Sequence, residues 1–259
     1  MQKIVVITGA SAGIGKATAK YFMDRGDKVY NLARRKNEVT ENITCDVSKK
    51  EDVENAIRTV FEKEKRIDVL INSAGMGIAG PVETTEEEAI RKIFDVNFFG
   101  TVFAIQSVLP IMREIGGGTI INLSSAGAPL SLPFQAFYSS TKSAITTLTE
   151  ALRLEVKPYN IKVCSVLPGD IVTEFTKNRE TNIPDSVYKE TAEKSVRKMS
   201  NDELNGMSPK NIAKLIYKMA KKKNPPVYVV GGVSYKLLVA LSKILPKRLV
   251  VGLIGKLYA

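Results

Sequence analysis

Residues 3–15 read Lys-Ile-Val-Val-Ile-Thr-Gly-Ala-Ser-Ala-Gly-Ile-Gly, an apolar run that passes directly into a glycine-rich turn. The run is typical of a buried strand, and residues 16–22 are typical of a helix. Gly9, Gly13 and Gly15 therefore lie where a strand turns into a helix, and there the backbone can approach a pyrophosphate bound at the positive helix end. The spacing is G-x-x-x-G-x-G rather than the common G-x-G-x-x-G. The stretch predicts a nucleotide-binding turn, and the alternative is a glycine-rich turn without a ligand.

Short strand-like runs alternate with longer helical patterns along most of the chain, which is the signature of βαβ units and a parallel sheet. Strands are expected at 3–8, 27–33, 42–46, 67–72, 118–124, 161–167 and 226–230. No internal repeat or linker divides the 259 residues. We expect an α/β fold: one Rossmann-type domain over residues 1–259, with a doubly wound parallel sheet of about seven strands and helices on both faces.

Several helices are expected from their first residues. Ser48 and Thr85 are each followed three residues later by a glutamate, which fits a capping box, and Ser208 stands before a proline that fits the first helical position. Residues 134–157 are expected to form one long helix.

Two regions depart from the alternation. Residues 170–207 are polar with scattered apolar side chains, too long for a plain connection, and are expected to form a substrate-binding loop or lid. The C-terminal extension 233–259 contains two apolar segments separated at Pro246, and lysines and an arginine interrupt both, so neither is expected to span a membrane.

The formal charge of +11 lies entirely in residues 204–259, which include the C-terminal extension and hold eleven Lys or Arg and no Asp or Glu. A basic, apolar tail can contact an anionic membrane surface, a substrate, a partner such as an acyl carrier protein, or the protein's own core. The lysine-rich stretch lacks interleaved aromatics and a recognition motif, so nucleic-acid binding is not expected.

Composition limits the chemistry. The chain has no histidine and two cysteines, Cys45 and Cys164, so a zinc site of the usual kinds is excluded, and we expect buried, reduced thiols. An acid or base that works near neutral pH must then be another side chain. Because the first strand begins at once, with no secretory leader pattern before it, a cytoplasmic location is expected.

The end of the second expected strand, Asn31-Leu32-Ala33-Arg34-Arg35, determines the expected cofactor. A carboxylate at this point accepts hydrogen bonds from a ribose 2′-hydroxyl, whereas arginine accommodates a 2′-phosphate. Arg34 and Arg35 therefore favour NADP(H) over NAD, and the alternative is two solvated loop arginines.

Tyr138 lies thirteen residues after Ser125 and four before Lys142, in a chain that also has Asn97 in an expected helix. With these residues the chain resembles the classical short-chain dehydrogenases/reductases over residues 3–232. The motifs that carry the resemblance are Thr8 to Gly15, Asp46 after the third strand, Asn72-Ser73-Ala74-Gly75 after the fourth, Asn97, Ser125, Tyr138-x-x-x-Lys142, and Pro168-Gly169 with Thr173. Two departures are Ser73, where a second asparagine is more usual, and Ala12, where many NADP users carry a basic residue.

The resemblance implies a catalytic tetrad of Asn97, Ser125, Tyr138 and Lys142. With the glycine turn and the two arginines, the implied cofactor-binding residues are Gly9, Ser11, Gly13, Ile14, Gly15, Arg34, Arg35, Asp46, Val47, Asn72, Ala74, Gly75, Tyr138, Lys142, Pro168, Gly169 and Thr173.

A free tyrosine has a pKa of about 10, and a lysine one helical turn away favours its phenolate form. In the reductive direction Tyr138 is expected to donate a proton to a carbonyl oxygen, with Ser125 hydrogen-bonded to that oxygen. The resemblance further implies that Lys142 binds the nicotinamide ribose and that Asn97 fixes a water for proton relay. Each residue taken singly also fits a packing or solvated role.

The expected substrate pocket is formed by the lid, by segment 126–137 and by the tail. Its candidate lining is apolar: Leu130, Leu132, Phe134 and Phe137. We therefore expect NADP(H)-dependent interconversion of a lipophilic ketone and a secondary alcohol, with a hydroxysteroid-like substrate favoured. The alternatives are reduction of a 3-oxoacyl thioester and, in another class, a non-catalytic NADP-binding redox sensor or a membrane-docking module. The family usually forms dimers or tetramers, here through 85–113 and 134–157.

Overall fold

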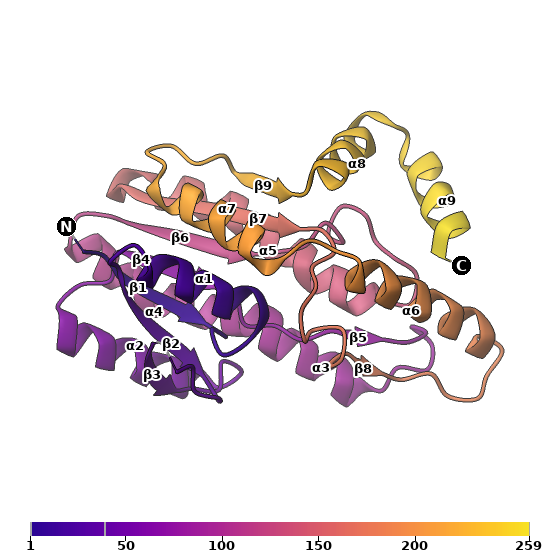
Figure 1. The fold of residues 1–259 in the computed structure, drawn as a ribbon, viewed down its shortest axis with the longest axis horizontal. Helices are drawn as coiled ribbons and strands as arrows, with labels where there is room; N and C mark the ends of the chain where they lie inside the picture. Colours follow the sequence, from indigo (N-terminus) through magenta and orange to yellow (C-terminus); the bar gives the residue numbers. More distant parts are fainter. Residues whose placement is uncertain (1, 39, 259) are drawn as a thin grey trace.

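The computed structural model describes residues 2–38 and 40–258, and its centre is a seven-stranded parallel sheet (Figure 1). The order across the sheet is β3-β2-β1-β4-β6-β7-β9. The strands are β1 (Ile4–Thr8), β2 (Lys28–Ala33), β3 (Glu41–Thr44), β4 (Val69–Asn72), β6 (Gly118–Leu123), β7 (Ile161–Pro168) and β9 (Tyr228–Gly231). All seven expected strands are confirmed.

Helices cover both faces of the sheet, and β1 shows why its sequence is apolar throughout. Val5 and Ile7 point into the core under the helices α1 and α7, whereas Ile4 and Val6 point into the core under α2, α4 and α5. The helices are α1 (Gly13–Met23), α2 (Lys50–Glu64), α4 (Gly100–Glu114), α5 (Ala136–Glu155) and α7 (Pro209–Lys221). A strand with both faces buried has no polar side, so its residues do not alternate.

The strand order reverses between β1 and β4. After β1 the chain builds β2 and β3 on one side, and it then crosses to β4 and continues through β6, β7 and β9 on the other side. The loops that follow β1 and β4 therefore leave the same edge of the sheet side by side, which is where parallel α/β sheets bind their ligands.

The expected lid is partly regular. Helix α6 (Lys189–Leu204) fills its second half, and the short strand β8 (Glu180–Thr181) pairs with β5 (Ile78–Ala79). The tail forms two helices, α8 (Val233–Ile244) and α9 (Lys247–Tyr258), separated at Pro246 as expected. Figure 1 shows both tail helices standing outside the layers that cover the sheet, with α9 above α6.

Two of the expected caps are wrong. The Ser48 hydroxyl donates to the Asp46 carboxylate at 2.7 Å, and α2 begins later. The Thr85 hydroxyl donates to the carbonyl oxygen of Pro81 at 2.7 Å, before helix α3 (Glu87–Phe94). In both cases the hydroxyl is hydrogen-bonded to a local acceptor, and it does not accept a backbone amide from the first turn of the helix. The Ser208 cap is confirmed, because its hydroxyl accepts the amide of Lys210 at 3.3 Å.

Helix α3 continues through a π-helical turn, η1 (Asp95–Phe99), into α4. Among the described residues, this continuous helix Glu87–Glu114 is the one long and apolar enough to cross a membrane by length and composition. Its α4 part packs on the sheet and on α2, which is the position of a core helix.

Candidate active site

The glycine turn after β1 has no room for a side chain at Gly9 or at Gly15. Gly9 has φ +71°, and a Cβ placed on it would lie 2.7 Å from the Cα of Ala74. A Cβ on Gly15 would lie 2.3 Å from the carbonyl oxygen of Gly9. Gly13 has φ +51° and faces the side chain of Thr173, 3.4 Å from the position of its missing Cβ. The structure thus brings four expected cofactor residues and the loop after β7 around one bare stretch of backbone.

The loop after β4 is fixed to this turn by a residue at the end of β1. The hydroxyl oxygen of Thr8 accepts the amides of Ser73 at 3.1 Å and Ala74 at 3.2 Å. A Cβ on Gly75 would lie 3.3 Å from Asn97 Oδ1. The two loops therefore pack closely against each other, and Gly9 and Gly75 occupy positions where a side chain would press on neighbouring atoms.

Sequence reasoning missed the residues that place the two arginines after β2. Asn31 is fully buried, its Oδ1 accepts the amide of Ala10 at 2.9 Å, and its Nδ2 donates to the carbonyl oxygen of Arg35 at 3.2 Å. Asn37 donates to the carbonyl oxygen of Ala10 at 2.7 Å. The two asparagines connect the glycine turn to the exposed Arg34–Arg35 pair. The signal in the sequence was Asn31 itself, because a polar residue inside an otherwise apolar strand needs hydrogen-bond partners.

Asp46, after β3, lies close to Arg34. Burial raises the pKa of Asp46, but hydrogen bonds from Ser48 and the positive charge of Arg34 lower it more, so its pKa lies below its usual range. Asp46, Ser48 and Arg34 line one surface hollow together with Asp95 and Val96. An ionised acceptor beside a guanidinium suits the adenosine end of a nicotinamide cofactor.

The other expected cofactor residues lie at the same edge of the sheet. Ser11 and Ile14 belong to the glycine turn, Val47 is buried after β3, Asn72 ends β4, and Pro168 ends β7 before Gly169. Asn72 donates to Asn122 Oδ1 at 2.8 Å, and its own Oδ1 is buried without a hydrogen-bond partner. The bare glycine backbone and this free acceptor fit a bound nicotinamide cofactor.

Helix α5 holds Tyr138 and Lys142 on one face, one turn apart. The Lys142 ammonium is buried, donates to the carbonyl oxygen of Leu123 at 3.0 Å, and lies 5.7 Å from the centre of the Tyr138 ring. Burial lowers the pKa of Lys142 to about 8. Burial raises the pKa of Tyr138 to about 12, against a hydrogen bond with Ser125 that lowers it. The four-residue spacing brings Tyr138 and Lys142 together, and the hydrogen bond to Ser125 adds a third residue of the expected tetrad.

Asn97 lies in the π-helical turn, a distortion that often marks functional sites. Its Oδ1 accepts the amide of Met76 at 2.8 Å, and its Nδ2 donates to the carbonyl oxygen of Met76 at 3.0 Å and to the Thr141 hydroxyl at 3.1 Å. The side chain joins the loop after β4 to α5, beside Lys142. Its expected role in holding a relay water stays a prediction.

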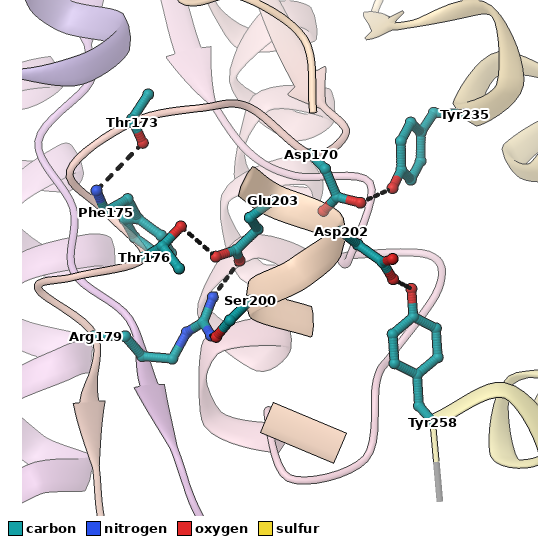
Figure 2. A network of polar contacts seen from close by, with 10 residues as sticks. All are labelled: Asp170, Thr173, Phe175, Thr176, Arg179, Ser200, Asp202, Glu203, Tyr235 and Tyr258. Carbon is teal, nitrogen blue, oxygen red and sulfur yellow. Dashed lines mark hydrogen bonds and ion pairs between the residues drawn. The ribbon is translucent and has the colours of Figure 1, made fainter. Parts of the chain in front are cut away.

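The lid contacts the tyrosine through Phe175, whose ring centre is 5.6 Å from that of Tyr138. Figure 2 shows the polar network behind this contact, in which the buried Arg179 guanidinium pairs with Glu203 and donates to the Ser200 hydroxyl at 3.3 Å. The Thr176 hydroxyl donates to the same Glu203 carboxylate at 2.6 Å. Arg179 Nε is buried without a hydrogen-bond partner. The network fixes the first half of the lid against α6.

Segment 126–137 lies at the same end of α5. Leu130 packs with Leu167, Val230 and Tyr235, whereas Leu132, Phe134 and Phe137 are half-buried. Phe134 has φ +58°, a left-handed conformation that costs free energy in a non-glycine residue and tends to occur at functional sites.

No group of three or more potential metal-ligating His, Cys, Asp or Glu side chains occurs among residues 2–38 and 40–258. Cys45 and Cys164 are buried and free, as expected, and burial raises the pKa of each thiol to about 12. Such thiols are unreactive.

Comparison with known proteins agrees with this geometry, since residues 3–184 match the family model for short chain dehydrogenase. The chain belongs to the short-chain dehydrogenase family. It is 39% identical over 247 residues to a 3-ketodihydrosphingosine reductase of Bacteroides thetaiotaomicron, covering 93% of this chain and 92% of the relative.

Solved structures share the fold. A short-chain dehydrogenase from Streptomyces avermitilis superposes with a TM-score of 0.83 at 29% identity, over 94% of each chain. A 3-ketoacyl-(acyl-carrier-protein) reductase from Brucella melitensis, complexed with NADH, has a TM-score of 0.76 at 26% identity, over 88% of this chain and 96% of that one. ElxO with NADP bound has a TM-score of 0.76 at 27% identity, over 92% of this chain and 100% of that one. The protein is therefore an oxidoreductase of a family that acts on carbonyl and hydroxyl groups and binds a nicotinamide cofactor.

Proposed function

We propose that this protein is an NADPH-dependent reductase of a lipophilic ketone, with Tyr138 as the proton donor. The single observation that carries the proposal is the cluster of Tyr138, Ser125 and Lys142 at the edge where two bare glycine loops meet. When bound there, the nicotinamide cofactor supplies the hydride. The chain's own residues hold the carbonyl group and protonate it.

The proton moves from the Tyr138 hydroxyl to the substrate oxygen. With its pKa raised to about 12 by burial, the phenol is protonated near neutral pH and ready to donate. Ser125 donates a hydrogen bond to the same oxygen as negative charge develops on it. Lys142 then stabilises the phenolate, and its ammonium, which lies next to Gly75, would also bind the ribose of the cofactor. Asn97 positions this lysine by joining two of its neighbouring segments.

NADP(H) rather than NAD(H) follows from the loop after β2. Arg34 and Arg35 are exposed, Arg34 lies close to Asp46, and the described residues of this loop place no carboxylate at the end of β2. A guanidinium pair favours a 2′-phosphate. The relatives support either cofactor, since NADP and NADH both occur among them.

For the substrate we favour a ketone on a long alkyl chain. The 39% identity to a 3-ketodihydrosphingosine reductase and the apolar contact of Phe175 with Tyr138 support this class. The hydroxysteroid-like ketone expected from the sequence is a second lipophilic candidate. A 3-oxoacyl thioester is the third, supported by the fold of the Brucella melitensis reductase.

The test is NADPH oxidation against 3-ketodihydrosphingosine, a steroid ketone and a 3-oxoacyl thioester, with NADH in parallel. We expect turnover of the sphingoid ketone with NADPH. Selective turnover of the steroid or the thioester would replace the substrate class, and NADH preference would overturn the role of Arg34 and Arg35. No turnover of any ketone would favour a non-catalytic NADP-binding protein.

The wider arrangement is proposed on the same grounds. We propose one domain over the described chain, a homodimer or homotetramer through α4 and α5, and a cytoplasmic location with peripheral membrane contact. Phe99, the last residue of η1 before α4, is 42% exposed, which supports an oligomer contact there.

A further inference from the structure

Helix α8 has two apolar faces. Tyr235, Val239 and Ser242 face the protein, and Val239 is buried. On the opposite side, four large apolar residues recur at intervals of four, four and three and so share one face. They are Val233, Leu237, Leu241 and Ile244, with exposed fractions of 85%, 61%, 41% and 81%.

Helix α9 repeats this arrangement. Val250 is buried, and Ile254 and Tyr258 continue its face at intervals of four. A second apolar stripe at the same interval faces solvent: Leu249, Leu253 and Leu257, with exposed fractions of 49%, 49% and 65%. The seven large apolar side chains of these two stripes make up an exposed patch, and Leu238 and Val251 are exposed on the same helices; such exposed apolar surface marks an interaction site.

The charge of the region indicates what covers this patch. All charged side chains on the two helices are basic: Lys236, Lys243, Lys247, Arg248 and Lys256. No Asp or Glu occurs in residues 204–259. A second copy placed on this patch would bring like charges together. The rest of the protein already holds another face of each helix, through Val239 and Val250. An anionic lipid surface meets both properties, since it takes up apolar side chains and attracts lysines.

We propose that helices α8 and α9 dock the protein on the surface of an anionic lipid bilayer. In this docking the seven apolar side chains enter the boundary between headgroups and acyl chains. The basic side chains of the two helices attract the anionic headgroups.

Helices α8 and α9 are also fixed to the lid by hydrogen bonds. The Tyr235 hydroxyl donates to Asp170, the Tyr258 hydroxyl donates to Asp202 at 2.9 Å, and Lys247 Nζ donates to the carbonyl oxygen of Pro129 at 3.1 Å (Figure 2 shows the two tyrosines). Docking therefore places the lid and segment 126–137 beside the bilayer. Entry of a lipophilic ketone from the membrane rests on the proposed function, whereas membrane binding does not.

The first test uses the full-length protein and sedimentation with vesicles. We expect binding to phosphatidylcholine vesicles that contain phosphatidylglycerol, and at least tenfold weaker binding to phosphatidylcholine alone or in high salt. Leu237→Ser with Ile244→Ser should reduce binding at least tenfold. Val82→Ser is the matched control, because Val82 is 61% exposed in the loop before α3 and lies neither on the tail helices nor on α4 or α5.

The second test uses the absence of tryptophan from the chain. Leu253→Trp gives a single-tryptophan protein whose emission should shift to the blue when anionic vesicles are added, whereas Val82→Trp should not respond. No binding to anionic vesicles, or equal loss of binding in the Val82→Ser control, would overturn the proposal. Loss of oligomer mass in Leu237→Ser with Ile244→Ser, without vesicle binding by the parent, would assign the patch to a second copy instead. Unchanged NADPH turnover of a water-soluble ketone in this double variant separates docking from catalysis.

Discussion

Replacing Lys142 by methionine is expected to make the protein more stable at neutral pH while it removes activity. Lys142 is buried, and burial lowers the pKa of its ammonium from 10.5 to about 8. Below pH 8 the group is charged in both the folded and the unfolded state, so the folded state bears a cost of about 3 kcal/mol. The variant loses the hydrogen bond to the Leu123 carbonyl, which costs about 1 kcal/mol. The net expected gain at pH 7 is about 2 kcal/mol.

The lowered pKa of Lys142 also determines how the stability difference between the variant and the wild type changes with pH. Between pH 8 and 10.5 the folded protein releases the Lys142 proton while the unfolded chain retains it, so the cost of burial falls as pH rises. The free energy of unfolding of Lys142→Met minus that of the wild type should therefore fall from about 2 kcal/mol at pH 7 to near zero at pH 10. Cys45 and Cys164 contribute equally to the pH dependence of stability in both proteins, so their contribution cancels in the difference.

The assay is urea unfolding followed by circular dichroism at both pH values, without cofactor. Lys214→Met, on the exposed side of α7, is the control for loss of one positive charge. A Lys142→Met protein that is less stable than the wild type at pH 7, or a difference that stays constant up to pH 10, would refute the reasoning. Loss of NADPH turnover alone would not, because it is expected on either account.

Three further predictions concern the acid, the turn and the cofactor. Tyr138→Phe should reduce NADPH turnover by about 10²–10⁴-fold and leave the Kd for NADPH, measured by fluorescence, nearly unchanged. Gly9→Ala should weaken NADPH binding and lower the unfolding midpoint more than Gly26→Ala, because both glycines have positive φ but only Gly9 has a backbone neighbour within 2.7 Å of the new methyl group. Arg34→Ala should lower the NADPH-over-NADH ratio of kcat/KM at least tenfold, whereas Lys36→Ala, in the same exposed turn, should leave it within about twofold.

The sequence predicted the sheet well because its strands are buried on both faces and interrupted by clear helical patterns. All seven strands and the break of the tail at Pro246 are confirmed. Strands β5 and β8 were missed, since each has two residues and their pairing depends on how the lid folds back. Helix α6 was read only as lid, because Lys189–Leu204 is polar and buries few side chains, chiefly Ala192, Ser195 and Met199.

The site was predictable where spacing along one element determines proximity. Tyr138 and Lys142 meet because they lie one turn apart, and the glycine turn follows from β1. The Arg179–Glu203 pair could not be predicted, because 24 residues and a change of element separate its members. Asn31 could not be given a role either, since its partners lie in two loops whose closeness depends on the strand order.

The opposite pKa changes of Tyr138 and Lys142 have one cause, and they bear on the proposed role of Tyr138 as proton donor. Burial disfavours the charged form of each group, so it raises the pKa of the phenol and lowers that of the ammonium. The lid adds to the first effect, since the carboxylates of Glu203 and Asp170 raise the pKa of Tyr138 and Arg179 opposes them. A protonated phenol is the form that can donate to a carbonyl oxygen. Because the phenolate left behind lies next to the Lys142 ammonium, the negative charge gains its partner only after the proton has moved. This arrangement suits Tyr138 to the proposed role of proton donor to a carbonyl oxygen, and the reverse proton transfer uses the same pair of residues.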